Sequence, residues 1–215
     1  MEQNLWLYAD KSEIDATGIN IITFGAEVFK RAKIISELSK FRDLRKALEK
    51  KEIAPSHPEI IEYAFENLID TVRILVFFEN YMKAALISKG YCIHKLNKDI
   101  SGFDKITSQQ YLRPISLKEI NEIEPFKINQ SEKKIEHSAL KETTIGLKEL
   151  LSSKYSIHYN IEKGILEQIS QLKIVRNQLH FYGSINFTIS DKLILQMEKL
   201  NEFVDKTIEK LKTPV

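Results

Sequence analysis

Cysteine, glycine and proline are scarce in this chain of 215 residues, and each shortage excludes a class of structure. The single cysteine, Cys92, rules out an intramolecular disulfide framework and a zinc site made of several cysteines, and it suits a reducing compartment. Seven glycines and five prolines are too few for a turn-rich sandwich or barrel. The composition therefore favours long helices.

Long apolar runs are also missing. No run reaches the length that a membrane-spanning helix needs, and the start of the chain, Met1-Glu2-Gln3-Asn4, lacks the basic region of a signal peptide. We therefore expect a cytoplasmic protein without a membrane partner. The 32 basic and 30 acidic residues nearly cancel, so net charge neither requires nor excludes a nucleic-acid partner.

The motifs of most common enzyme classes are absent too. The sequence has no glycine-rich phosphate loop, no Gly-x-Ser-x-Gly, no His-Glu-x-x-His and no Glu-x-x-His. Four of the five histidines stand alone and are assigned no role: His57, His94, His137 and His158. We expect neither a metal nor a cofactor.

What the sequence does contain is helical periodicity. Apolar residues at steps of three and four predict one helix over residues 26–51. Its core positions are Val28, Ala32, Ile35, Leu38, Phe41, Leu44 and Leu48. Residues 20–25 before it fit either a short extended piece or a loop.

A second, longer helix is predicted to begin near Ser56 and to end at Gly90. Ser56 is the expected N-cap, with Pro58 in the first turn and Glu59 completing a capping box. The expected core stripe is Ile61, Ala64, Leu68, Val72, Leu75, Met82 and Leu86. Glu79 interrupts this stripe between Leu75 and Met82.

The second half of the chain is less regular. Residues 91–131 contain breakers and one short helical candidate, residues 117–123, and are expected to form an irregular insertion or lid. Further helices are predicted over residues 133–154, 160–182 and 190–211.

These elements predict an all-α fold. We find no internal repeat and no linker rich in glycine, serine or proline. The expectation is therefore a single domain over residues 1–215, built as a bundle of five to six helices.

The segment with recognisable chemistry is Arg176-Asn177-Gln178-Leu179-His180. On a helix, the apolar residues before it form one face: Ile161, Ile165, Ile169, Leu172, Val175 and Leu179. Arg176 and His180 are one turn apart on its flank, within about 80° of its centre, so both are predicted to be half-buried. Arginine is a bidentate phosphate donor and histidine a general base, which together suffice for metal-free RNA cleavage. Asn177 would hold one of the two in its working rotamer.

A structural interpretation of the same residues remains open. Arg176 would pair with a carboxylate of a neighbouring helix, and His180 would cap the last helical turn, where a cation is favourable.

The segment resembles the signature of the HEPN superfamily, in which Arg-Asn is followed by a histidine near the end of a late helix. The stretch from Phe78 to Tyr91 is similar to an early helix of many bacterial HEPN proteins, and the resemblance spans about residues 57–213. It implies a helical bundle that dimerises around two Arg/His pairs, with endoribonuclease activity in toxin or antiviral defence, in some cases under a cognate antitoxin or regulator. Many members are instead non-catalytic modules that bind RNA, a nucleotide or a partner protein.

Two details bear on which of these readings applies. The family usually has four to six residues between Arg and His, whereas this chain has three, and an alignment on Arg176-Asn177 places the family's histidine at Phe181. Tyr182 lies two residues after His180, where a tyrosine of the toxin branch can receive a nucleotide from a partner enzyme; the other reading is an aromatic residue that packs at a helix end.

We further expect a two-fold homodimer, because one Arg/His pair offers little of the enclosed cleft that phosphate chemistry needs. A basic stretch could line the approach for RNA, or could be a solvated helix face of mixed charge. It comprises Lys30, Arg31, Lys33, Lys40, Arg42, Arg45, Lys46, Lys50 and Lys51.

The last expectation concerns Glu79 on its apolar stripe. A carboxylate there needs a cation, and Arg176 is the other polar residue expected on an apolar flank, so the two are predicted to touch. Lys83 would then be a second phosphate contact. The alternative is that Glu79 pairs with Lys83, one turn away on its own helix.

Overall fold

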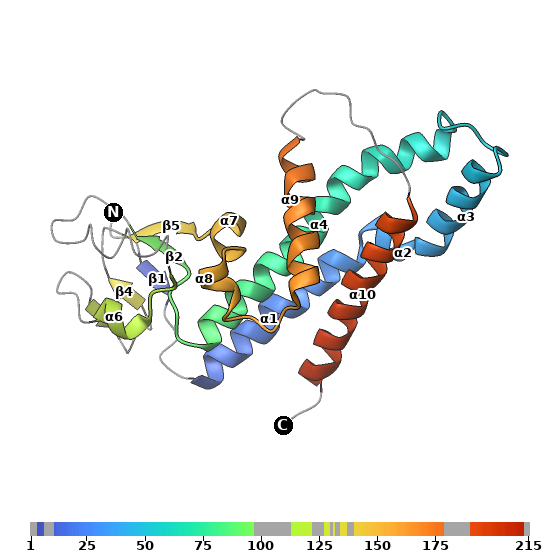
Figure 1. Cartoon of the computed structure of the whole chain (residues 1–215). Coiled ribbons are helices and arrows are strands. Elements are labelled where there is room, and N and C mark those ends of the chain that lie inside the picture. Colours follow the sequence, from blue (N-terminus) through green and yellow to red (C-terminus); the bar gives the residue numbers. More distant parts are fainter. Residues whose placement is uncertain are drawn as a thin grey trace. The chain divides into compact units, whose positions relative to one another are not determined.

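The computed structural model describes residues 4–6, 11–96, 113–121, 127–129, 131, 134–136, 140–178 and 190–212. Over these residues the protein is predominantly helical, as predicted (Figure 1). The helices are α1 (Lys11–Lys30), α2 (Lys33–Ser36), α3 (Leu38–Glu49), α4 (Pro58–Ser88), α6 (Leu117–Asn121), α7 (Leu147–Leu150), α8 (Ser153–Ser156), α9 (Lys163–Gln178) and α10 (Asp191–Lys212). The strands are β1 (Asn4–Trp6), β2 (His94–Leu96), β3 (Lys127–Asn129), β4 (Lys134–Glu136) and β5 (Leu140–Thr144).

The chain divides into two compact units, each made of two separate stretches of sequence. Unit 1 comprises Met1–Ile21 and Glu79–Ile161, and unit 2 comprises Ile22–Phe78 and Glu162–Val215. The helices α1 and α4 contribute residues to both units. The single domain expected over residues 1–215 stays a prediction.

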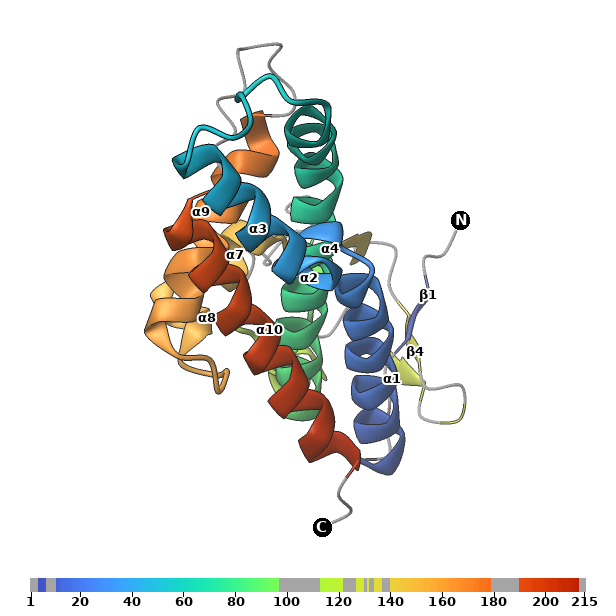
Figure 2. The same cartoon turned by 90° about the vertical axis from the view of Figure 1, so that its right-hand side faces the viewer.

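Unit 2 is a helical unit with an aromatic core. The helix α10 packs along α2 and α3 and also contacts α9 (Figures 1 and 2). The rings of Phe29, Phe77 and Phe78 lie 5.1 to 6.4 Å apart between centroids, and Phe203 of α10 packs on Phe78 at 5.7 Å. Such tilted and edge-on ring pairs are favourable arrangements for buried aromatic side chains.

The helix predicted over residues 26–51 begins earlier in the structure and is interrupted after α1. Residues 20–25 are helical and belong to α1, because Ile22, Ala26 and Phe29 form one buried face. The helix then breaks at Ala32, whose backbone is extended. The break carries no proline or glycine. It is stabilised instead by the buried Asp70 of α4, which accepts a hydrogen bond from the backbone N–H of Ile34 at 2.9 Å.

The long helix α4 has nearly the predicted extent, but its first residues are arranged differently. The N-cap position is taken by His57 rather than Ser56, and His57 Nδ1 accepts the backbone N–H of Glu59 at 3.4 Å. At the other end Gly90 has φ 76°, and the N–H groups of Gly90 and Tyr91 bond the carbonyls of Ile87 and Leu86. This is a Schellman motif, so the predicted stop at Gly90 is confirmed.

Among the described members of the predicted core stripe of α4, only those of the second half are buried; the side chains of Ala64 and Leu68 lie outside the described part of the chain. Leu75, Met82 and Leu86 are buried, whereas Ile61 and Val72 are exposed. The position between Leu75 and Met82 is filled by the fully buried Phe78, three residues after Leu75, so Glu79 lies beside the stripe and not in it. Up to Phe77, α4 instead buries the face opposite Ile61 and Val72, with Ile60, Tyr63, Ile74 and Phe77.

Unit 1 combines short helices with two small antiparallel sheets. One sheet has the order β1-β4-β3, and the other pairs β2 with β5. The helix predicted over residues 133–154 is therefore wrong: the segment holds β4 and β5, followed by the one-turn helices α7 and α8. Thr143 and Thr144 are β-branched, which suits a strand. Hydrogen bonding of β4 to β1 and β3, and of β5 to β2, accounts for the extended conformation of this segment. The predicted insertion, residues 91–131, contributes β2, β3 and the expected short helix, α6.

Candidate functional site

Arg176 lies in the last turn of α9, within the helix that was predicted over residues 160–182. This helix starts at Lys163, three residues later than expected, and buries Ile165, Ile169 and Leu172 on one face. Arg176 is half-buried beside this face. A guanidinium at the C-terminal end of a helix also interacts favourably with the helix dipole.

The partners expected around Arg176 are only partly described. Asn177 belongs to α9, but its side chain lies outside the described part of the chain. His180 and Tyr182, and with them Phe181, lie outside the described residues altogether. The Arg176–His180 geometry therefore stays a prediction.

Glu79 and Lys83 form a half-buried ion pair on α4. The Nζ of Lys83 lies 2.5 Å from Glu79 Oε1 and donates a second hydrogen bond to Thr144 Oγ1 of β5 at 2.8 Å. The side chains of Lys83 and Glu79 are 14% and 27% exposed, so water is partly excluded from the pair. His94 of β2 is the register partner of Thr144, which places it on the same face of the two-stranded sheet.

This geometry is the alternative arrangement of Glu79 that the sequence left open. The predicted contact of Glu79 with Arg176 would join residues of the two different units, and it stays a prediction. The pairing with Lys83 already gives the Glu79 carboxylate a cation. It also engages the Lys83 ammonium, which the sequence predicted to contact a phosphate.

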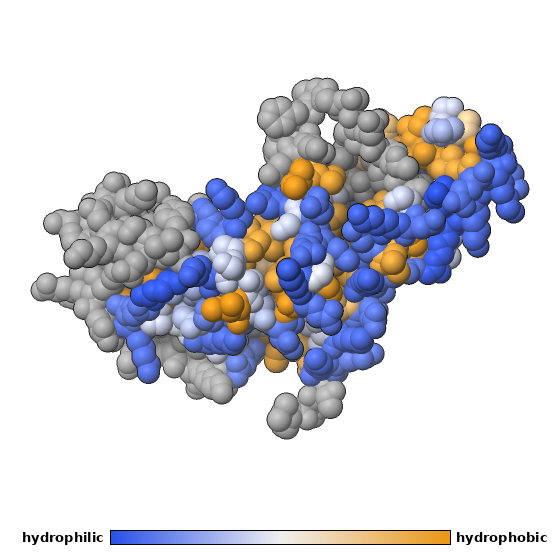
Figure 3. Space-filling model, in the orientation of Figure 1, coloured by the Kyte–Doolittle hydropathy of each residue, from blue (hydrophilic) through white to orange (hydrophobic). Residues whose placement is uncertain are grey.

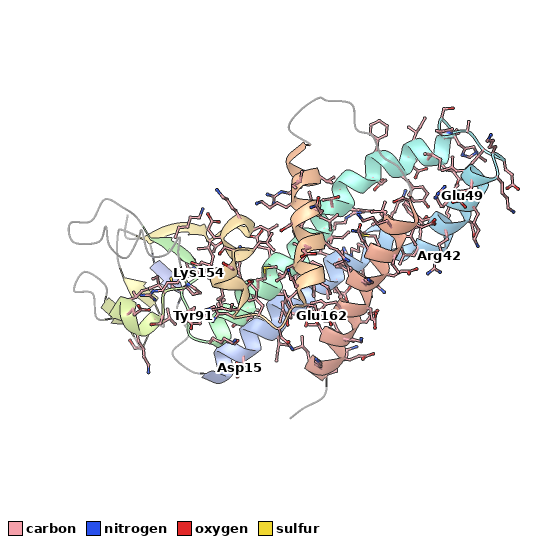
Figure 4. All side chains as sticks on the ribbon, viewed as in Figure 1. Asp15, Arg42, Glu49, Tyr91, Lys154 and Glu162 are labelled. Carbon is pink, nitrogen blue, oxygen red and sulfur yellow. The ribbon has the colours of Figure 1, made fainter. Side chains whose placement is uncertain are left out.

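The basic stretch around α2 and α3 is extensively paired with carboxylates of unit 2. Arg42 contacts Glu198, and Arg45 binds Glu49 at 2.6 Å (Figure 4, in which Arg42 and Glu49 are labelled). Further pairs are Lys30–Asp205 at 2.6 Å, Lys33–Glu62 at 2.5 Å and Lys40–Glu59 at 3.4 Å. The structure thus favours a surface of mixed charge over a basic track for phosphates.

Other groups of chemical interest in unit 1 have structural surroundings. Burial raises the pKa of the Cys92 thiol to about 11, so the thiol is protonated and a weak nucleophile. Burial and the nearby Lys89 lower the pKa of His158, whose ring packs edge-on against Tyr91. Among the described residues no group of three His, Cys, Asp or Glu side chains could hold a metal ion, and no helix is long and apolar enough to cross a membrane.

Sequence reasoning missed the most deeply buried charge of the described residues, Asp70, which is 1% exposed. Its Oδ1 binds Arg73 Nη1 at 2.9 Å, and Arg73 also donates to the carbonyl of Arg31, beside the break between α1 and α2. The sequence signal was the polar pair Asp70-Thr71 within an apolar stretch. Both residues are buried in the structure, where a polar side chain needs a hydrogen-bond partner.

Comparisons with known proteins give no relative for this chain. No family model, no curated protein and no solved structure matches it.

Proposed function

We propose that the chain is a HEPN-type, metal-independent endoribonuclease that acts as a homodimer in bacterial toxin or antiviral defence. The observation that supports it is the half-buried Arg176 in the last turn of α9, with His180 four residues further along the sequence. A guanidinium beside a buried helical face is a permanent donor for a phosphate.

In this proposal His180 is the general base and Arg176 binds the phosphate. His180 takes the proton of an RNA 2′-hydroxyl, and the 2′-oxygen attacks the adjacent phosphorus. Arg176 stabilises the negative charge of the crowded phosphate. The 5′-oxygen leaves with a proton supplied by water or by the imidazolium, giving a 2′,3′-cyclic phosphate and a 5′-hydroxyl. Asn177 positions one of the two groups. Tyr182 would receive a nucleotide from a partner enzyme, and a cognate antitoxin or regulator would control the nuclease.

The test is RNA cleavage by the purified chain with and without EDTA, compared with growth arrest on expression. We expect cleavage to survive EDTA and to fall by about a hundredfold or more in His180→Ala and in Arg176→Ala. His158→Ala is the matched control, because His158 packs against Tyr91 in unit 1. Intact RNA and identical growth for wild type and His180→Ala would contradict the nuclease.

A second candidate is a non-catalytic helical module that binds RNA, a nucleotide or a partner protein. It is favoured by the three-residue spacing between Arg176 and His180, which is shorter than the family pattern. The ion pairs of the basic stretch also neutralise positive charge that RNA phosphates would otherwise bind. Binding that persists in His180→Ala without cleavage in wild type would favour this candidate, and steep weakening of that binding with salt would indicate phosphate contacts.

A further inference from the structure

Four large apolar side chains are exposed along one face of α4. Ile61, Phe65, Ile69 and Val72 are 45%, 69%, 53% and 40% exposed. Their spacing of four, four and three residues places them within about 80° around the helix axis, at 100° per residue. We call these four residues the α4 stripe. Figure 3 shows the hydrophobic surface over this part of α4. Single exposed apolar residues are ordinary, whereas a continuous row of them marks an interaction surface.

The core of unit 2 does not need the α4 stripe. The opposite face of the same helix supplies the core, where Tyr63 packs on Phe41 with ring centroids 4.1 Å apart and Phe77 packs on Phe29 at 5.7 Å. The helix therefore has two apolar faces, of which one is already buried within unit 2. A second apolar face of this kind requires a partner.

We infer that the α4 stripe is the interface between two copies of this chain, which pair their α4 helices antiparallel about a two-fold axis. An axis level with the middle of the stripe places Phe65 opposite Ile69 of the second copy, and Ile61 opposite Val72. Such a contact is isologous, because the same side chains serve both copies. The inference stands whether the chain cleaves RNA or only binds a partner.

Charges beside the α4 stripe fit the same arrangement. Glu62 and Arg73 lie on one edge of it, about 20 to 40° further around the helix. In an antiparallel two-fold pair the same edges of both helices meet, so Glu62 of one copy comes close to the level of Arg73 of the other. Glu62 binds Lys33 at 2.5 Å through Oε1 and is still 60% exposed. Arg73 uses Nη1 for Asp70 and Arg31, while a guanidinium has five donors.

The edge charges also argue against a membrane as the occupant. An interfacial helix for anionic lipid carries lysine and arginine beside its apolar face. The edge of the α4 stripe instead carries both signs of charge: Glu62 and Glu66, which both lie within 4 Å of Lys33, and Arg73, which binds Asp70.

The first test is the oligomeric state of the full chain by analytical ultracentrifugation. We expect a dimer at micromolar concentration whose dissociation constant rises about tenfold or more in Phe65→Glu. Phe24→Glu is the matched control, because Phe24 is 64% exposed on α1 and lies outside the α4 stripe. A monomeric wild type, or a dimer that Phe24→Glu weakens and Phe65→Glu leaves intact, would overturn the inference. RNA cleavage is assayed on the same samples. A dimer that cleaves no RNA would contradict the nuclease alone, and a monomer that cleaves RNA would contradict the interface alone.

A second test addresses the antiparallel register. Mixing a Phe65→Cys chain with an Ile69→Cys chain under mild oxidation should give more cross-linked dimer than either chain alone, because residues 65 and 69 face each other. The natural Cys92 is buried and adds no background. Equal cross-linking in all three samples would contradict this register, and circular dichroism confirms that each variant is folded.

Discussion

The two stretches of α4 distribute charged and apolar side chains differently. In the first stretch, up to Phe78 in unit 2, the charged Asp70 is buried while the neighbouring Ile69 is 53% exposed. In the second stretch, from Glu79 in unit 1, Met82 and Leu86 are fully buried and the charged pair Glu79–Lys83 lies beside them. The second stretch thus follows the usual amphipathic pattern, whereas the first buries one apolar face together with a carboxylate and leaves a second apolar face exposed.

The difference has a local cause. Asp70 is buried because the chain breaks between α1 and α2, and the break leaves the N–H of Ile34 and the carbonyl of Arg31 without helical partners. Asp70 and Arg73 supply those partners. Unpaired backbone groups of one element can therefore draw a charged residue of another element into the core, as the break between α1 and α2 does with Asp70.

The largest effect is expected at Asp70. Asp70→Ala removes the acceptor for Ile34 N–H and leaves Arg73 without its carboxylate, so the free energy of unfolding should fall by about 3 kcal/mol. Urea denaturation followed by circular dichroism measures it. The matched control is the adjacent Ile69→Ala, expected to cost about 0.5 kcal/mol or less where the chain is monomeric, because Ile69 is exposed. In the monomeric chain, a larger loss in Ile69→Ala than in Asp70→Ala would contradict this assignment of the buried and the exposed side chain.

Periodicity predicted the helical class, the end of α4 at Gly90 and the last helix, α10, nearly to the residue. These features depend on local signals, such as a glycine with positive φ or the Ser190 side chain that accepts the N–H of Leu193 at 3.2 Å. The break at Ala32 and the strands β4 and β5 were missed because they depend on partners distant in sequence.

A medium effect is expected for the pair Glu79–Lys83. Glu79→Ala should lower the free energy of unfolding by about 1 kcal/mol, since the pair is only half-buried. A double-mutant cycle with Lys83→Ala should give a coupling of about 0.5 to 1 kcal/mol. The same cycle with Arg176→Ala tests the contact expected from the sequence. A loss of about 3 to 5 kcal/mol in Glu79→Ala, coupled to Arg176, would instead support that contact.

For the candidate site, the sequence placed Arg176 correctly on the flank of a buried face, because α9 has a regular apolar period up to Leu172. It could not identify Thr144 as a partner of Lys83, because that contact requires β5 to pair with β2. It also misplaced Glu79 in the core stripe, since steps of three and four from Leu75 both fit a helix and Phe78 takes the buried position.

The smallest effect is expected at Glu119, in the segment that follows α4 in unit 1. Glu119 binds Arg113 at 2.5 Å and exchanges hydrogen bonds with Ser116 in a capping box at the start of α6. The Arg113 guanidinium and then the Ser116 groups lower the pKa of Glu119 to about 2. A carboxyl with a lowered pKa in the folded protein stabilises it above the ordinary value near 4.5, and this contribution disappears as the pH falls from there towards 2.

The measurement is the free energy of unfolding of wild type and Glu119→Gln between pH 5.5 and 2.5. The advantage of wild type over Glu119→Gln should shrink across this range, by less than about 1 kcal/mol, because the Glu119 side chain is 36% exposed and water screens the pair. Glu202→Gln is the comparison on the surface of α10, where the hydrogen bond from Lys206 lowers the pKa of Glu202, so its pH dependence should have the same sign. A free-energy difference between wild type and Glu119→Gln that stays constant with pH would contradict this prediction. It would mean that Glu119 acts through its hydrogen bonds alone and that its charge does not stabilise the fold of residues 113–121.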